Sequence, residues 1–157
     1  MNVVSVRGIE IRDVPYDTPV VQRLVTAALA DLADRYGGSG DDTPVAATDF
    51  RPPDGQFLIA VAGDIPVGCA GWRSHGPDAE LKRLFTTAQA RGRGVARAVL
   101  RAVEDSARAH GRTRMILECG NRQPEAVSLY RSVGYQPIEN FGFYRDEPDC
   151  LSFARTL

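Results

Sequence analysis

The chain has 157 residues, of which 43% are hydrophobic and 25% charged, and its formal net charge is -1. This balance predicts one globular domain, residues 1–157, with its own core, and argues against nucleic acid as the main partner. No apolar run approaches the ~20 residues that span a bilayer, and Met1–Arg12 lacks a signal-peptide core, so we expect no membrane partner and a cytoplasmic location.

The first half of the chain predicts antiparallel strands around one helix. Alternating apolar residues in 3–14 predict a half-buried strand. Thr18 is the expected N-cap of a helix that begins at Pro19 and ends at the glycines of 37–40. The proline-containing stretch up to residue 55 predicts a long loop, with room for a short helical turn, of the kind that often covers a site.

The pattern then changes from strands alone to alternating strands and helices. Two apolar runs flank Gly63-Asp64 and predict a hairpin, which a turn at 76–78 joins to a strand at 79–86. A helix over Val95–His110 and a short buried strand over Met115–Leu117 follow, and the usual crossover makes this strand parallel to the one before.

The last part of the chain completes the fold class. Pro124 begins a second helix of this half, Gly134 ends it, and a last strand lies around residues 151–153. We therefore predict an α/β (α+β) fold: a mixed, mostly antiparallel sheet flanked by helices, with one central β-α-β unit.

The junction between the strand at 79–86 and the next helix carries the strongest chemical signal. It reads Arg91, Gly92, Arg93, Gly94, Val95 and Ala96, followed by Arg97. Glycines let backbone N–H groups approach a ligand, and the helix N-terminus and the arginines attract anions, so this loop predicts phosphate binding. The third glycine of a dinucleotide fingerprint is replaced by Arg97, but Glu118 could mimic the ribose-binding acid, which leaves a nicotinamide alternative open.

Cysteine and histidine usage argues against a metal site. Cys69, Cys119 and Cys150 are odd in number, lie in apolar segments and include no C-x-x-C pair, while His75 and His110 are far apart. We expect buried free thiols and no metal. Cys119 also has no histidine nearby in sequence that would favour a nucleophilic thiol.

Residues 79–135 resemble the GNAT N-acetyltransferases. Arg91, Gly94 and Ala96 meet that family's Q/R-x-x-G-x-G/A motif, and 79–86 is similar to its fourth strand. Asn121 and the segment 129–135 follow in the order of its "LY…GF" signature. The resemblance implies the GNAT fold, acetyl-CoA as cofactor, and acetyl transfer to an amine.

The resemblance also implies where acetyl-CoA binds. The loop from Arg91 to Arg97 would hold the pyrophosphate, and the strand edge at Leu84, Phe85 and Thr86 would pair with the pantetheine amides. The backbone N–H of Leu84 would stabilise the oxyanion. Asn121 would hydrogen-bond the pantetheine, although an asparagine there can equally form a turn.

Two further residues match the family's acid–base positions. Glu80 would be the general base for the amine, with a structural role beside Lys82 and Arg83 as an equal alternative. Tyr130 would be the general acid for the CoA thiolate, with core packing as its alternative.

The acceptor is the least determined part of the sequence. Aromatic and acidic residues of the tail, with Tyr144 among them, could line a pocket for a cationic amine, whereas Arg73 could hold an acceptor carboxylate. The leading prediction is a small-molecule amine acceptor. The alternatives are a protein lysine or N-terminal amine, or a non-catalytic acyl-CoA sensor. Because many relatives are dimers, a homodimer is also expected.

Overall fold

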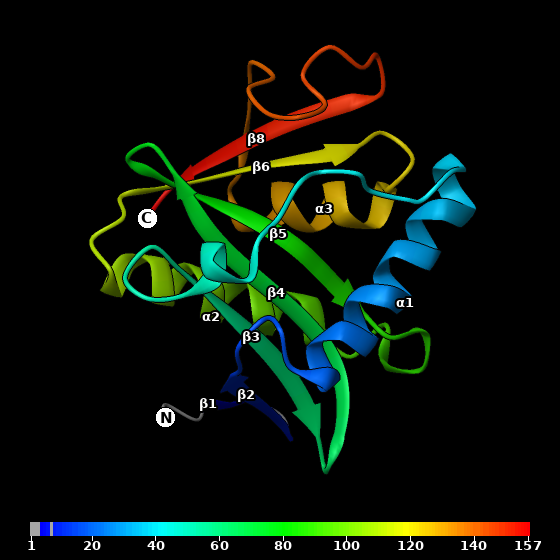
Figure 1. The fold of residues 1–157 in the computed structure, drawn as a ribbon, viewed down its shortest axis with the longest axis vertical. Coiled ribbons are helices and arrows are strands. Elements are labelled where there is room, and N and C mark those ends of the chain that lie inside the picture. Colours follow the sequence, from blue (N-terminus) through cyan, green and yellow to red (C-terminus); the bar gives the residue numbers. More distant parts are fainter. Residues whose placement is uncertain (1–3, 7) are drawn as a thin grey trace.

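A computed structural model describes residues 4–6 and 8–157, which form an eight-stranded sheet with helices on both faces (Figure 1). The strands are β1 (Val4–Val6), β2 (Ile9–Asp13), β3 (Gly55–Ala62), β4 (Ile65–His75), β5 (Asp78–Thr86), β6 (Arg114–Gly120), β7 (Gln136–Ile138) and β8 (Cys150–Thr156). The helices are α1 (Pro19–Tyr36), α2 (Val95–Ala109) and α3 (Pro124–Val133), with 3-10 turns η1 (Ala47–Phe50) and η2 (Ala88–Ala90).

The strand order is β1-β2-β3-β4-β5-β6-β8-β7, and every neighbouring pair is antiparallel except β5 and β6. This confirms the predicted mixed, mostly antiparallel sheet with one β-α-β unit, formed by β5, α2 and β6. None of the described helices is long and apolar enough to cross a membrane.

Three local predictions need correction. The single strand expected over 3–14 is two strands, β1 and β2, and residues 3 and 7 of that range lie outside the described residues. Thr18 is the N-cap residue of α1 as predicted, but its side chain makes no capping hydrogen bond, because its hydroxyl donates to the carbonyl of Pro15 at 2.8 Å. The short edge strand β7 was not predicted; it contains Pro137, which is tolerated at an edge.

Two apolar clusters cover the two faces of the sheet. One joins α2 and Tyr130 of α3 to one face and contains Trp72, Val99 and Phe153. The other packs α1 and Phe50 of η1 against the opposite face. α1 therefore packs an apolar side on the sheet, with Val21, Leu24 and Val25 buried in it.

The divergence of β5 and β6 creates the main opening in the sheet. They pair only at Ala79–Met115 and Glu80–Ile116. Figure 1 shows the two strands side by side near their starts and diverging toward α1. Beyond Glu80, the facing edge of β5 is free of β6, so its backbone groups are available to an extended ligand.

β5 also contains a bulge at this opening. Lys82 pairs with Gly71 of β4 and Phe85 with Cys69, so Arg83 and Leu84 together stand opposite one residue of β4. Arg83 has φ 60°, the left-handed region that L-residues seldom adopt. The bulge therefore re-aims the backbone at Leu84, where the sequence predicted an oxyanion donor.

Candidate active site

A cavity of about 350 Å³ lies where β5 and β6 diverge. Its walls come from α1 and the loop after it, from residues 81–84 of β5, from residues 117–120 of β6, and from α3 and the loop before β8. Cavities of this volume suit small ligands. Of the residues predicted for the site, Leu84, Tyr130 and Tyr144 line this cavity.

The free edge of β5 ends with residues Leu84, Phe85 and Thr86. Leu84 packs partly against the α2 face, whereas Phe85 packs on the α1 face. The Thr86 hydroxyl is buried, and none of the described residues hydrogen-bonds it. The structure therefore presents the backbone of this segment, and one spare hydroxyl, at the predicted pantetheine position.

The loop predicted to bind phosphate is open at the start of α2. Gly92 and Gly94 have φ 79° and 81°, and a Cβ on either would meet nothing within 4 Å. Gly94 is the N-cap residue of α2, so the first N–H groups of the helix are directed out of the loop. These glycines leave room for a pyrophosphate at the positive end of the helix.

Two arginines of this loop, Arg91 and Arg97, contact side chains on neighbouring helices. Arg91 forms an ion pair with Asp31 of α1 at 3.2 Å, and Arg97 donates to the Ser132 hydroxyl of α3 at 2.9 Å. A guanidinium has five N–H donors, so each retains donors for a phosphate.

Tyr130 is buried on α3 and lines the cavity. Its ring packs near Tyr135 and Phe153, at centroid distances of 5.7 and 6.2 Å. Burial raises the pKa of the Tyr130 phenol well above its usual value, so it stays protonated at neutral pH. Tyr130 thus combines the packing role with a proton that is available to the cavity.

Glu80 and Arg73 lie outside the cavity lining. Glu80 is 3% exposed, and its carboxylate accepts from Arg73 Nε at 2.9 Å. Arg73 also donates to Asp49 at 3.2 Å and to the carbonyl of Pro44 at 2.8 Å. These contacts engage the two side chains with each other and with residues 44 and 49, and neither side chain lines the cavity.

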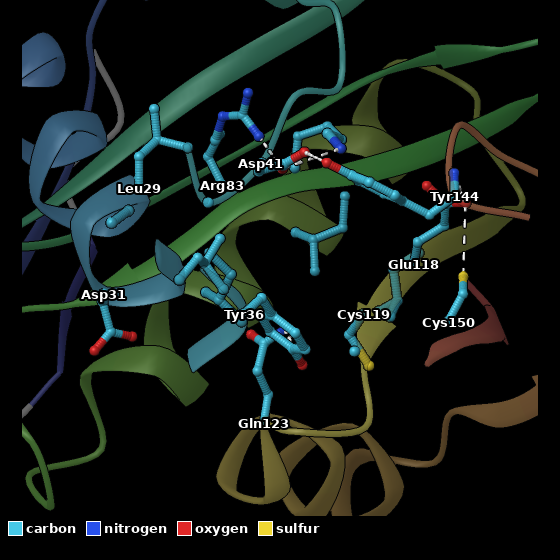
Figure 2. A pocket seen from close by; sticks show the side chains of 18 of the residues that line it. Leu29, Asp31, Tyr36, Asp41, Arg83, Glu118, Cys119, Gln123, Tyr144 and Cys150 are labelled. Carbon is cyan, nitrogen blue, oxygen red and sulfur yellow. Dashed lines mark hydrogen bonds and ion pairs between the residues drawn. The ribbon is translucent and has the colours of Figure 1, made fainter. Parts of the chain in front are cut away.

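A different carboxylate, Glu118 on β6, faces the cavity. Its Oε1 accepts from the backbone N–H of Tyr144 at 3.1 Å and from the thiol of Cys150 at 3.9 Å (Figure 2). Its Oε2 is buried and has no hydrogen-bond partner among the described residues. Gly142 leaves room for this carboxylate, since a Cβ there would lie 2.4 Å from Glu118 Cδ.

Tyr144 connects the tail loop to the loop after α1. Its hydroxyl donates to Asp41 Oδ1 at 3.1 Å and accepts from the backbone N–H of Asp42 at 2.6 Å. Figure 2 shows its side chain reaching from the side of Glu118 to Asp41. Tyr144 therefore helps to form a roof over the cavity.

Asn121 lies beside this roof, outside the cavity lining. Its backbone N–H and its side-chain amide donate to Asp149, at 3.0 and 3.3 Å. In this structure Asn121 therefore ties the end of β6 to the tail.

Lys82, Arg83 and Asp41 form a charged cluster on the β5 side. Arg83 donates to Asp41, and Lys82 Nζ lies 3.9 Å from Asp41 Oδ2. Burial lowers the pKa of the Lys82 ammonium, although Asp41 opposes the shift. Burial alone would raise the pKa of Asp41, but Lys82 and Arg83 lower it overall.

Sequence reasoning did not place Lys82, Asp41 and Glu118 at the cavity, where the structure has them. The available signal was charge within apolar runs: Lys82 lies in 79–86 together with Glu80 and Arg83, and Glu118 is the one charged residue of 115–119. Two cysteines were also expected to be buried but are only partly so: Cys119 and Cys150 line the cavity. Burial raises the pKa of Cys119 to about 12, so its thiol is protonated and unreactive at neutral pH.

The divergent strands, the bulge and the glycine loop together define an acyl-CoA-type transferase fold, and comparison with known proteins agrees. The family described as "Acetyltransferase (GNAT) family" matches residues 23–135. An IAA acetyltransferase of Azospirillum brasilense is 32% identical over 154 residues, covering 93% of this chain and 95% of that relative. The chain belongs to the GNAT acetyltransferase family, and the nicotinamide alternative is withdrawn.

Solved structures share the fold over nearly the whole chain. A Klebsiella pneumoniae protein assigned to the acyl-CoA N-acyltransferases has a TM-score of 0.79 at 25% identity, covering 95% of this chain and 97% of that one. A GNAT family acetyltransferase of Elizabethkingia anophelis with acetyl-CoA bound has a TM-score of 0.70 at 18% identity, covering 96% and 99%.

Proposed function

We propose that this N-acetyltransferase transfers the acetyl group of acetyl-CoA to a primary amine of a small molecule. The observation that carries the proposal is the roofed cavity of about 350 Å³, which brings Glu118 and Tyr130 to the free edge of β5. The loop with Gly92 and Gly94 suits the pyrophosphate, and the related fold of the Elizabethkingia anophelis protein holds acetyl-CoA.

Each residue has a separate task in this reaction. The Leu84 N–H polarises the thioester carbonyl, and Glu118 accepts the proton that the attacking ammonium must lose. The amine nitrogen bonds to the carbonyl carbon and loses its second proton to solvent, and the carbon–sulfur bond breaks. Tyr130 gives its proton to the departing thiolate and is reprotonated from solvent. Glu118 replaces Glu80 as our candidate base, because Glu80 is buried against Arg73 outside the cavity.

The roof favours a small acceptor over a protein. Tyr144 binds Asp41 and Asp42 across the cavity, which narrows access from the α1 side. A protein lysine or N-terminus would need an open groove along the sheet instead. Steady-state release of CoA thiol, measured over a panel of small amines and of peptides, tests this choice. Faster turnover of peptides than of every small amine would contradict it.

CoA binding can be tested with two matched glycines. Gly94 and Gly111 lie near opposite ends of α2, have φ 81° and 80°, and face open space. Alanine at either position adopts a disfavoured φ at a cost of roughly 1–2 kcal/mol. We expect similar destabilisation of Gly94→Ala and Gly111→Ala, but a loss of CoA affinity in calorimetry only for Gly94→Ala. Equal CoA affinity in both folded variants would remove the loop from the binding site.

A further inference from the structure

Lys82 and Glu118 occupy matching positions on the two diverging strands. The last paired residues of β5 and β6 are Glu80 and Ile116. Two residues further along, Lys82 stands opposite Glu118 on the same face of the sheet, because side chains alternate with a period of two. Both residues line the cavity. The opening between the strands therefore has a cation on one side and a carboxylate on the other.

The cationic side has hydrogen-bond donors to spare. The distance of 3.9 Å from Lys82 Nζ to Asp41 is too long for a hydrogen bond, although Lys82 is only 7% exposed. The Arg83 side chain is 5% exposed, and its Nε is buried with no partner among the described residues. One carboxylate, Asp41, thus serves two largely buried cations, since the nearby Glu80 is engaged by Arg73.

The anionic side has an acceptor to spare. Glu118 uses Oε1 for Tyr144 and Cys150, while its buried Oε2 has no partner among the described residues. A buried charge without a matching group is costly, so each side of the opening favours a ligand group of opposite charge.

We propose that the acceptor is an amino-acid-type molecule, which carries a carboxylate as well as the reacting amine. The inference rests on the proposed function. Glu118 holds the ammonium and accepts its proton, while Lys82 and Arg83 hold the carboxylate by charge-assisted hydrogen bonds. A simple amine would leave the Lys82 and Arg83 donors without an anion, and a simple acid would leave Glu118 without a cation.

Matched acceptors test the inference directly. α-Amino acids and ω-amino acids of increasing length are each compared with their own carboxamides, at equal concentration of free amine. For the wild-type protein we expect at least one acid to exceed its amide in kcat/KM by roughly tenfold or more. Amides or simple amines that match or exceed every acid would overturn the inference and leave acetyl transfer to amines intact. Absence of both CoA binding and acetyl transfer would instead overturn the proposed function.

A variant identifies the carboxylate-binding side. Lys82→Met keeps the length of the side chain without its charge, and should lower kcat/KM for the acid roughly 10- to 100-fold more than kcat/KM for the amide. Lys82→Arg should recover part of the loss, and Arg101→Met, an exposed position on α2, is the control. An equal loss for acid and amide would contradict the assignment. If Lys82→Met does not fold, the wild-type comparison decides.

Discussion

Gly142→Ala adds one methyl group directly against the Glu118 carboxylate and tests its position without removing its charge. A Cβ at residue 142 would lie 2.4 Å from Glu118 Cδ, 2.5 Å from Oε1 and 2.6 Å from Oε2. Ordinary contact begins at 3.4 Å, so the carboxylate must move by about 1 Å. Gly142 is not among the glycines of positive φ, so its backbone accepts alanine.

The displacement should cost activity more than stability. Misplacement by about 1 Å can lower a rate ~100-fold, which corresponds to ~2.7 kcal/mol of transition-state stabilisation. We therefore expect kcat/KM to fall between about 10- and 100-fold. The moving atoms are the end of a flexible side chain, so the main loss of stability is the hydrogen bond from Tyr144, at most ~1.5–3 kcal/mol.

Three measurements separate these effects: thiol release, CoA affinity by calorimetry, and thermal unfolding. Asp146→Ala, an exposed change in the same loop, should leave all three unchanged. CoA affinity should also persist in Gly142→Ala, because the three atoms nearest to the added Cβ all belong to Glu118, which we place on the acceptor side. A folded Gly142→Ala protein that binds CoA and keeps wild-type kcat/KM would refute the role of Glu118.

Three other changes test the acid, the base and the charged cluster. Tyr130→Phe should lower turnover ~10²–10⁴-fold with CoA affinity retained, and full turnover with chemistry rate-limiting would leave Tyr130 a core residue. Glu118→Gln should lower the rate most at neutral pH and recover as pH approaches the amine pKa of ~10.4. The pH–rate profile of Glu80→Gln serves as the comparison, and recovery there instead would return the base to Glu80. Asp41→Asn should lower the free energy of unfolding at neutral pH, because Lys82 helps to depress the pKa of Asp41 in the folded protein. In denaturant titrations, the difference in unfolding free energy between the two proteins should shrink as the pH falls below ~3.9 and through that lowered pKa. A difference that stays constant with pH would contradict this expectation.

The fold could be predicted from the sequence because its signals are local. The β3–β4 hairpin follows from two apolar runs around Gly63-Asp64, and α2 from a glycine loop followed by an apolar stripe. Tyr130 could be placed on a helix because the segment that carries it, 129–135, is contiguous. The turn at 76–78 made β4 and β5 neighbours, and in the observed register Arg73 pairs with Glu80.

The charged groups of the cavity depend on contacts that no local pattern specifies. The opposition of Lys82 and Glu118 follows from the register of two parallel strands that are joined only through α2. The close contact of Gly142 with Glu118 and the reach of Tyr144 to Asp41 depend on how the tail folds back over the sheet. These positions are set by tertiary packing, so sequence reasoning could assign the base to Glu80 from the family motif but had no signal for Glu118, the base we propose.

The bulge that contains Arg83 contributes to the site we propose for the acceptor as well as to the site we propose for the thioester. A non-glycine residue at φ 60° costs roughly 1–2 kcal/mol, and glycine would adopt the same backbone at little cost. The arginine side chain offsets this cost by pairing with Asp41, which Tyr144 also contacts. The same residue thereby shapes the backbone before Leu84, anchors the roof through Asp41, and directs spare N–H donors to where we place the acceptor carboxylate. A strained backbone persists only where several surrounding contacts hold it in place. Here those contacts come from Asp41 and Tyr144, which line the cavity.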